Sequence, residues 1–213
     1  MQTQPEHVSA NSPHAGPTRL VGINTGAGKI LVLDNFVDTN NKSIASHAIA
    51  PINALGLSWT ADAGTWQIEA NSLQKTATDA THQQVWLDPA TPNTTLSVTM
   101  TIPSGKAGSG PTGRWSDHNN FWQIQAFQGQ NPDFTLNQNQ SGTFTQRASA
   151  HIGFAAGSYP VKVVFKGNTI TATFNGSTTI QYTLASFNNT ATKVGIDGFN
   201  TTVTYNGFQL TAP

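Results

Sequence analysis

Apolar and polar side chains alternate along most of this chain, which is the period-two pattern of strands that bury one face. Residues 66–71 and 96–102 place an apolar side chain at every second position, with polar side chains between them. Residues 120–127 repeat the pattern, with Trp122 on one predicted face and Gln123 on the other. These three stretches are therefore predicted to be strands with one face in a core.

Shorter runs of apolar, β-branched and aromatic residues predict further strands. They lie at residues 30–33, 85–87, 144–152, 159–165, 169–174, 178–184, 194–196 and 203–210. No stretch carries the 3.6-residue stripe of a helix, and residues 43–47 allow one helical turn at most. The glycine-rich residues 104–117 are predicted to form a long loop. About a dozen strands in one domain-sized chain favour an all-β fold, a two-sheet antiparallel sandwich.

The first 28 residues differ from the rest, because proline and glycine punctuate them and sustained apolar runs are absent. They are predicted to be either a disordered leader or an arm that docks on a neighbouring subunit. They also lack the basic and apolar regions of a secretory signal, so the protein is expected to stay inside the cell or to leave without one, for example in a virus particle. The chain is thus divided into an arm, residues 1–28, and one sandwich domain, residues 29–213.

Charge is scarce, since only 9% of the 213 residues are charged and ten basic side chains balance ten acidic ones. A neutral chain lacks the basic surface that binds phosphate backbones and anionic lipids, so neither nucleic acid nor a membrane is a predicted partner. No apolar run approaches the roughly 20 residues that span a bilayer. The absence of cysteine excludes disulfides, thiolate nucleophiles and zinc–thiolate sites.

The acidic residues do not form the pattern that glycoside hydrolysis requires, which is two carboxylates across the scissile bond. The only two glutamates are Glu6 in the arm and Glu69 on its own predicted strand, and no two acids lie two positions apart. The six histidines are scattered and form no HExxH pair, so no catalytic zinc site is predicted. We therefore expect a protein without enzymatic activity.

Three parts of the sequence resemble laminin-G-like, concanavalin A-like jelly-roll domains. The opening of such domains is similar to residues 34–36, 44–47, 59, 64–68 and 71. Their back-sheet hairpin is similar to residues 159–163 and 169–176, and their last two strands to residues 194–199 and 205–210. The resemblance implies a jelly-roll sandwich of a kind that binds sugars. Such domains also decorate bacteriophage tails and capsids. The resemblance therefore further implies a virion surface protein, a capsid decoration or tail-associated subunit that docks through its arm and sandwich edges.

Sugar recognition uses aromatic faces flanked by amides and by arginine, which donates to hydroxyl groups. Residues of these types are predicted to form a polar patch on the concave sheet if their strands are neighbours. The candidate contacts are Trp115, His118, Gln123, Gln125 and Arg147. The alternative is an ordinary solvated sheet surface. Four other tryptophans are predicted to belong to the core, namely Trp59, Trp66, Trp86 and Trp122.

The resemblance also implies a calcium ion, because laminin-G-like domains bind calcium with carboxylates at one edge of the sandwich. Asp34 and Asp197 are the candidate ligands, since they approach each other if the two ends of the chain pair. The simpler interpretation is that both carboxylates accept backbone N–H groups at strand ends, and no other cofactor is predicted. Two alternatives to the virion protein stay open: a free carbohydrate-binding module or lectin, and a sugar hydrolase of unusual site geometry.

Overall fold

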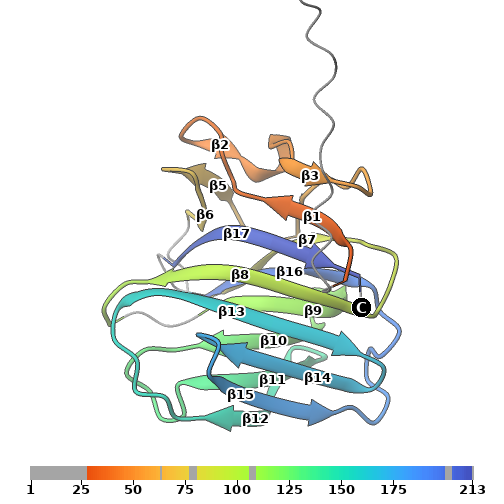
Figure 1. The fold of residues 1–213 in the computed structure, drawn as a ribbon. Helices are drawn as coiled ribbons and strands as arrows, with labels where there is room; N and C mark the ends of the chain where they lie inside the picture. The colour runs from red at the N-terminus through yellow and green to blue at the C-terminus, as the bar shows by residue number, and fades with distance from the viewer. Residues whose placement is uncertain (1–27, 63, 77–80, 106–108, 200–202, 213) are drawn as a thin grey trace, which may run out of the picture.

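The computed structural model describes residues 28–62, 64–76, 81–105, 109–199 and 203–212, whose strands form two antiparallel sheets packed as a sandwich (Figure 1). The predicted all-β, two-sheet antiparallel architecture is therefore confirmed. The predicted arm, residues 1–28, lies outside the described residues apart from Gly28. Within the described part of the chain, no helix has the length and apolar character needed to cross a membrane.

The larger sheet has ten strands. In spatial order it contains β15 (Thr178–Thr183), β14 (Thr169–Phe174), β13 (Gly157–Lys166), β8 (Thr94–Ile102), β17 (Thr204–Thr211), β6 (Ser72–Lys75), β5 (Trp66–Glu69) and β2 (Lys42–Ser43). Beside this path, β1 (Ile30–Asp34) pairs with β17 and with β3 (Pro51–Asn53). One turn of 3-10 helix, η1 (Ile44–Ser46), falls inside the segment for which a single helical turn is predicted.

The smaller sheet has seven strands. Its order is β12 (Thr143–Ala150), β11 (Phe134–Gln140), β10 (Asn120–Ala126), β9 (Gly110–Asp117), β16 (Lys193–Phe199), β7 (His82–Leu87) and β4 (Thr60–Ala61). We refer to the two as the ten-stranded and the seven-stranded sheet.

The apolar faces of both sheets form one core between them. On β10, Trp122 and Ile124 are buried in this core, and Gln123 lies on the opposite face, as the alternation predicts. From the ten-stranded sheet, Trp66 and Phe165 are packed into the same core. Each fully buried side chain of this size stabilises the fold by roughly 1.5–3 kcal/mol relative to an exposed one. A slip of one residue along a strand would turn these side chains to the other face, so their burial fixes the register of the strands.

The prediction of a loop at residues 104–117 is wrong for the second half of that range, because residues 110–117 form β9 in the middle of the seven-stranded sheet. Two glycines of β9 serve close packing rather than flexibility. A Cβ atom on Gly113 would lie 2.2 Å from the ring of Phe165, and one on Gly110 would lie 2.0 Å from the carbonyl oxygen of Ile124. Glycine at these positions lets β9 approach both the opposite sheet and the neighbouring β10.

Strand β11 was not predicted from the sequence. Its first residues alternate normally, with Phe134 and Leu136 buried in the core. Four consecutive amide residues, 137–140, then follow and hide the alternation. The structure places them in the strand because both neighbours, β10 and β12, supply hydrogen bonds to its backbone.

Candidate ligand-binding site

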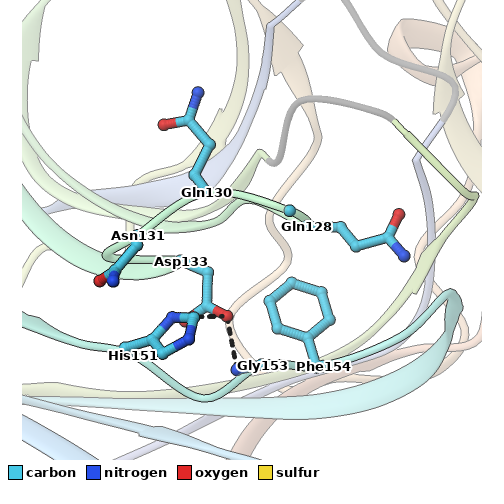
Figure 2. A pocket seen from close by; sticks show the side chains of 8 residues that line it. Gln128, Gln130, Asn131, Asp133, His151, Gly153 and Phe154 are labelled. Atoms are coloured by element: carbon cyan, nitrogen blue, oxygen red, sulfur yellow. Dashed lines mark hydrogen bonds and ion pairs between the residues drawn. The ribbon is translucent and has the colours of Figure 1, made fainter.

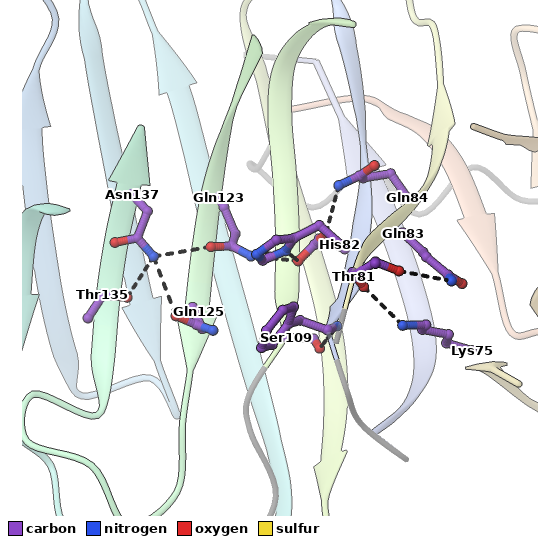
Figure 3. A network of polar contacts seen from close by, with 12 residues as sticks. Lys75, Thr81, His82, Gln83, Gln84, Ser109, Gln123, Gln125, Thr135 and Asn137 are labelled. Atoms are coloured by element: carbon purple, nitrogen blue, oxygen red, sulfur yellow. Dashed lines mark hydrogen bonds and ion pairs between the residues drawn. The ribbon is translucent and has the colours of Figure 1, made fainter. Parts of the chain in front are cut away.

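A polar network that includes His82, Gln84 and Gln123 lies on the outer face of the seven-stranded sheet (Figure 3). Its centre is the buried Asp197 of β16. The carboxylate accepts hydrogen bonds from Gln84 Nε2 at 2.7 Å, from His82 Nδ1 at 2.9 Å and from Gln123 Nε2. Asp197 is fully buried, and burial of an unpaired carboxylate carries a large desolvation cost. The three donors replace the water that this carboxylate loses.

The network continues from β10 to β11. Asn137 Nδ2 donates to Gln123 Oε1 at 3.1 Å and to Thr135 Oγ1 at 3.0 Å. Gln123 of β10 reaches Asp197 of β16 across β9, the strand that lies between them. Both ends of the Gln123 amide are thus bonded inside the protein, and the residue is 1% exposed.

Aromatic rings cover this network. Phe144 of β12 stacks on His82 of β7 with 4.3 Å between ring centroids, and Phe199 stacks on the same imidazole at 4.6 Å. Four strands separate β12 from β7 in the sheet, so these rings meet only because the sheet is strongly curved and this face is concave. The concave face is closed over its polar residues by these aromatic side chains.

Trp115 belongs to a second aromatic group on this face. Its ring stacks on Trp86 of β7 with 5.3 Å between centroids, and Lys193 Nζ lies 4.1 Å from the Trp86 ring and 4.6 Å from the Trp115 ring. Trp115 is buried and Trp86 is half-buried. The ammonium group covers the tryptophan pair in a cation–π contact. Trp86 therefore lies on the outer face, whereas Trp59, Trp66 and Trp122 belong to the core as predicted.

A pocket of about 320 Å³ lies where β11 and β12 of one sheet contact β15 of the other. It is lined by Trp122, Gln138, Gln140, Arg147, Tyr182, Ala185, Ser186 and Phe187, and we call it the Arg147 pocket. Its volume falls within the roughly 300–1,000 Å³ that is usual for small-molecule sites. Aromatic, amide, hydroxyl and guanidinium groups thus line a single cavity.

The polar groups of the Arg147 pocket are connected in series. Arg147 Nε donates to Gln138 Oε1 at 2.8 Å, and Gln138 Nε2 donates to Gln140 Oε1 at 2.7 Å. The guanidinium carbon of Arg147 lies 5.8 Å from the centroid of the Tyr182 ring. Among the described residues, no acceptor bonds to the terminal nitrogens of Arg147 or to the amide nitrogen of Gln140. These donors are available to a ligand.

A second pocket of about 350 Å³, the Asp133 pocket, lies at the opposite end of β11 and β12 (Figure 2). Its lining residues are Gln128, Gly129, Gln130, Asn131, Asp133, His151, Gly153 and Phe154. The Asp133 carboxylate is buried and accepts the backbone N–H groups of Ile152 and Gly153, both at 2.7 Å. This carboxylate therefore holds the chain in place after β12.

The condition for a single polar patch is not met, because β11 lies between β10 and β12 and the two strands are not neighbours. Gln123, Gln125 and Trp115 are on the concave face, where Gln123 and Trp115 are buried. Arg147 lies at the edge between the sheets, beside Tyr182. His118 is in the exposed turn after β9, where its Nδ1 atom is 3.0 Å from a carboxylate oxygen of Asp62.

The two candidate calcium ligands lie in different sheets. Asp34 accepts the backbone N–H of Phe36, the indole N–H of Trp59 at 2.7 Å and a hydrogen bond from His47 at 3.0 Å. Among the described residues, the donors to the Asp197 carboxylate are side chains, so the backbone-acceptor interpretation describes Asp34 and not Asp197. Across the described ranges, no three histidine, cysteine or acidic side chains are grouped so that they could hold a metal ion.

Sequence reasoning missed Tyr182, Gln138 and Gln140 as members of the site. Tyr182 lies on β15 of the other sheet, and its contact with Arg147 depends on how the sheet edges meet. Gln138 and Gln140 lie on β11, and their spacing places both on one face of that strand. The run of four amide residues could have indicated Gln138 and Gln140 as candidate ligand contacts, if residues 134–140 had been predicted to form a strand.

No protein-family model matches this chain, and no curated protein matches its sequence. Solved structures do match. The carbohydrate-binding module CBM66 from Bacillus subtilis is 15% identical, with a TM-score of 0.63 over 72% of this chain and 95% of that one. A Bacillus subtilis protein of unknown function with a galectin-like fold is 12% identical, with a TM-score of 0.57 over 72% and 89%. The GH43 protein BlXynB from Bacillus licheniformis is 14% identical, with a TM-score of 0.54 over 70% of this chain but only 34% of its own.

At these identities the likeness shows the fold alone. The fold is the jelly-roll sandwich found in a carbohydrate-binding module and in a galectin-like protein, as expected for a concanavalin A-like domain. The bacteriophage context and the choice of ligand residues stay predictions.

Proposed function

We propose that this chain is a non-catalytic carbohydrate-binding domain and that the Arg147 pocket is its sugar site. The observation that carries the proposal is the placement of an arginine over an aromatic ring, with its Nε atom held by a glutamine. Sugars are bound by contact with aromatic rings and by planar donors that reach their hydroxyl groups. The Arg147 pocket provides both kinds of contact in a cavity large enough for a small ligand.

The fold supports the proposal. One of the solved structures with this sandwich is a carbohydrate-binding module, and it is matched over nearly its whole length. The concave face contributes less, because Asp197 and Gln123 are already bonded to each other there. We therefore assign the sugar site to the sandwich edge, which differs from the concave-sheet patch expected from the sequence.

The distribution of acidic groups favours binding without catalysis. Two carboxylates must flank a glycosidic bond for hydrolysis. The Arg147 pocket is lined by no acidic residue, and the Asp133 pocket is lined by one, whose oxygens already accept two backbone N–H groups. Neither pocket offers the pair of acids that a glycoside hydrolase uses.

The test is a glycan array probed with the full chain, followed by calorimetry on the bound glycan. Gln140→Ala removes an exposed amide of the Arg147 pocket and should weaken binding about tenfold, which corresponds to roughly 1.4 kcal/mol. Gln130→Ala makes the same change in the Asp133 pocket and should leave the affinity unchanged. An array that stays silent at millimolar ligand refutes the function, and equal losses in both variants refute the choice of pocket.

We further propose that the domain acts on a virion surface, as a capsid decoration or tail-associated subunit. Two observations support this role: the resemblance of the sequence to phage-borne sandwich domains, and the zero net charge of the chain. The proposed partners are other virion subunits or further copies of this chain, contacted through residues 1–28. Electron microscopy of native particles tests this role, and a protein that purifies only as a free monomer contradicts it.

A further inference from the structure

The charge inside the Arg147 pocket is uncompensated. Arg147 is the one charged residue among those that line it. Among the residues that the structure describes, no acidic side chain forms an ion pair with Arg147. The pocket therefore presents a full positive charge beside an aromatic wall.

The orientation of this charge is fixed by the protein. Gln138 holds the Nε atom of Arg147 at 2.8 Å, and the guanidinium carbon lies 5.8 Å from the Tyr182 ring centroid. Because Nε is already used, the two terminal nitrogens are the groups left for a ligand. A guanidinium held in this way forms a fork that matches the two oxygens of a carboxylate, with two parallel charge-assisted hydrogen bonds.

The Asp133 pocket provides a contrast within the same molecule. It has a similar volume and also combines amides with an aromatic ring, but it contains the acidic Asp133, with His151 Nδ1 at 3.5 Å from the carboxylate, and no arginine or lysine. A carboxylated ligand is repelled there and attracted to the Arg147 pocket. Charge therefore distinguishes the two cavities, which are similar in volume.

Building on the proposed function, we infer that the Arg147 pocket selects an acidic glycan, in which the carboxylate of a uronic acid residue pairs with Arg147. The sugar ring lies against Tyr182, and Gln140 and Ser186 are the neighbouring polar side chains that meet its hydroxyl groups. Neutral sugars contact the same aromatic ring but leave the fork of the guanidinium without an anion.

The experiment pairs acidic and neutral glycans on one array: uronans, their neutral counterparts without carboxylates, and sulfated polysaccharides. The uronans are expected to bind, with an affinity that falls as salt is added. Calorimetry then compares the best-bound uronan oligomer with its methyl ester, which has the same shape but no charge. We expect the affinity for the ester to be lower by a factor of about ten or more, since the ester loses the charge-assisted pair of hydrogen bonds.

Two substitutions at the exposed Arg147 identify the group responsible. Arg147→Gln should abolish the preference for acid over ester, and Arg147→Lys should keep part of it, because lysine retains the charge and loses the fork. Lys162→Gln, at an exposed lysine of β13 that does not line the pocket, is the matched control and should change nothing.

The outcomes separate the two proposals. An array without any bound glycan refutes carbohydrate binding and removes the basis of the inference. Neutral glycans that bind as well as uronans, or an acid preference that survives Arg147→Gln, overturn the inference and leave carbohydrate binding standing. Stronger binding of sulfated polysaccharides than of uronans overturns the assignment to a carboxylate.

Discussion

The phenyl ring of Phe144 stacks on the imidazole of His82, with 4.3 Å between the ring centroids, although four strands separate their own strands in the sheet. This contact closes the concave face from one side to the other. Beneath it, Asp197 and Gln123 are almost completely buried, although both lie on the face that points away from the core. The seven-stranded sheet thus buries side chains on both of its faces.

Replacement of Phe144 by alanine should open the concave face. The variant loses ring contacts with His82 and Phe121, which we expect to lower the free energy of unfolding by about 1–2 kcal/mol. Urea denaturation measures this loss, and amide hydrogen exchange should become faster in β10 and β16. Val37→Ala, at a residue that is 66% exposed, is the control and should change stability by less than about 0.5 kcal/mol. Unchanged exchange in both strands would show that Phe144 does not cover the network.

The carboxylate of Asp197 should be more important for stability than its surface counterparts. In Asp197→Asn, the new amide nitrogen faces the side-chain donors Gln84, His82 and Gln123, so at least one buried donor loses its acceptor. We expect the free energy of unfolding to fall by about 3 kcal/mol. Asp62→Asn instead removes the partly exposed pair between Asp62 and His118, and should lower the free energy of unfolding by at most about 1 kcal/mol. Equal losses for the two variants in denaturant melts would argue against a buried anionic network.

Alternation of side chains predicts this fold well, because most of its longer strands, such as β8 and β10, bury an apolar face. Trp122 and Gln123 show the limit of that signal: the pattern assigns them to opposite faces correctly, but it cannot tell that Gln123 is itself buried. That burial depends on the curvature of the sheet, which brings Phe144 to His82. The residues of β9 and β11 escaped prediction for local reasons, since glycines and consecutive amides carry no apolar alternation.

The Arg147 pocket was predictable only in part. Arg147 was among the candidate residues chosen from the sequence, but the residues that line the pocket with it come from two sheets and a loop. Tyr182 approaches it because β12 and β15 are the outermost strands at the same side of the sandwich. Contacts between sheet edges depend on strand order, and no periodicity in the sequence encodes that order.

The glycines of β9 give a sharp test of the packing between the sheets. Gly113→Ala places a methyl group against the buried ring of Phe165 and should lower the free energy of unfolding by about 1–3 kcal/mol. The double variant with Phe165→Leu should destabilise less than the two single changes added together, because the smaller side chain makes room. Gly110→Ala meets a backbone carbonyl oxygen, which no side-chain change can relieve. Strict additivity in the first pair would contradict the contact.

Asp38 should contribute to the acid sensitivity of the fold. The hydrogen bond from His47, followed by that from the N–H of Thr39, holds the pKa of Asp38 below its ordinary value. A carboxyl group whose pKa is lowered by folding stabilises the protein above its unfolded pKa of about 4, and this contribution is lost as the pH falls through the folded value. Urea denaturation between about pH 3 and pH 6 should therefore show a shallower acid loss for Asp38→Asn than for the parent. Parallel curves would show that His47 does not interact preferentially with the ionised carboxylate.

Arg114 is a buried cation that the fold should tolerate losing. It is 1% exposed, and within the described residues its Nη2 atom donates to the carbonyl oxygen of Gly167 while Nε and Nη1 have no acceptor. Burial lowers the pKa of Arg114, yet an arginine stays protonated at any pH at which the protein is folded, so the desolvation cost is permanent. Arg114→Met, which keeps most of the volume beside Phe165, should match the parent within about 1 kcal/mol or exceed it. Arg114→Ala should lose about 2–4 kcal/mol through the cavity that it leaves. Thermal and urea unfolding of both variants measure these changes. A methionine variant as unstable as the alanine variant would show that the charge of Arg114, rather than its volume, stabilises this part of the sandwich.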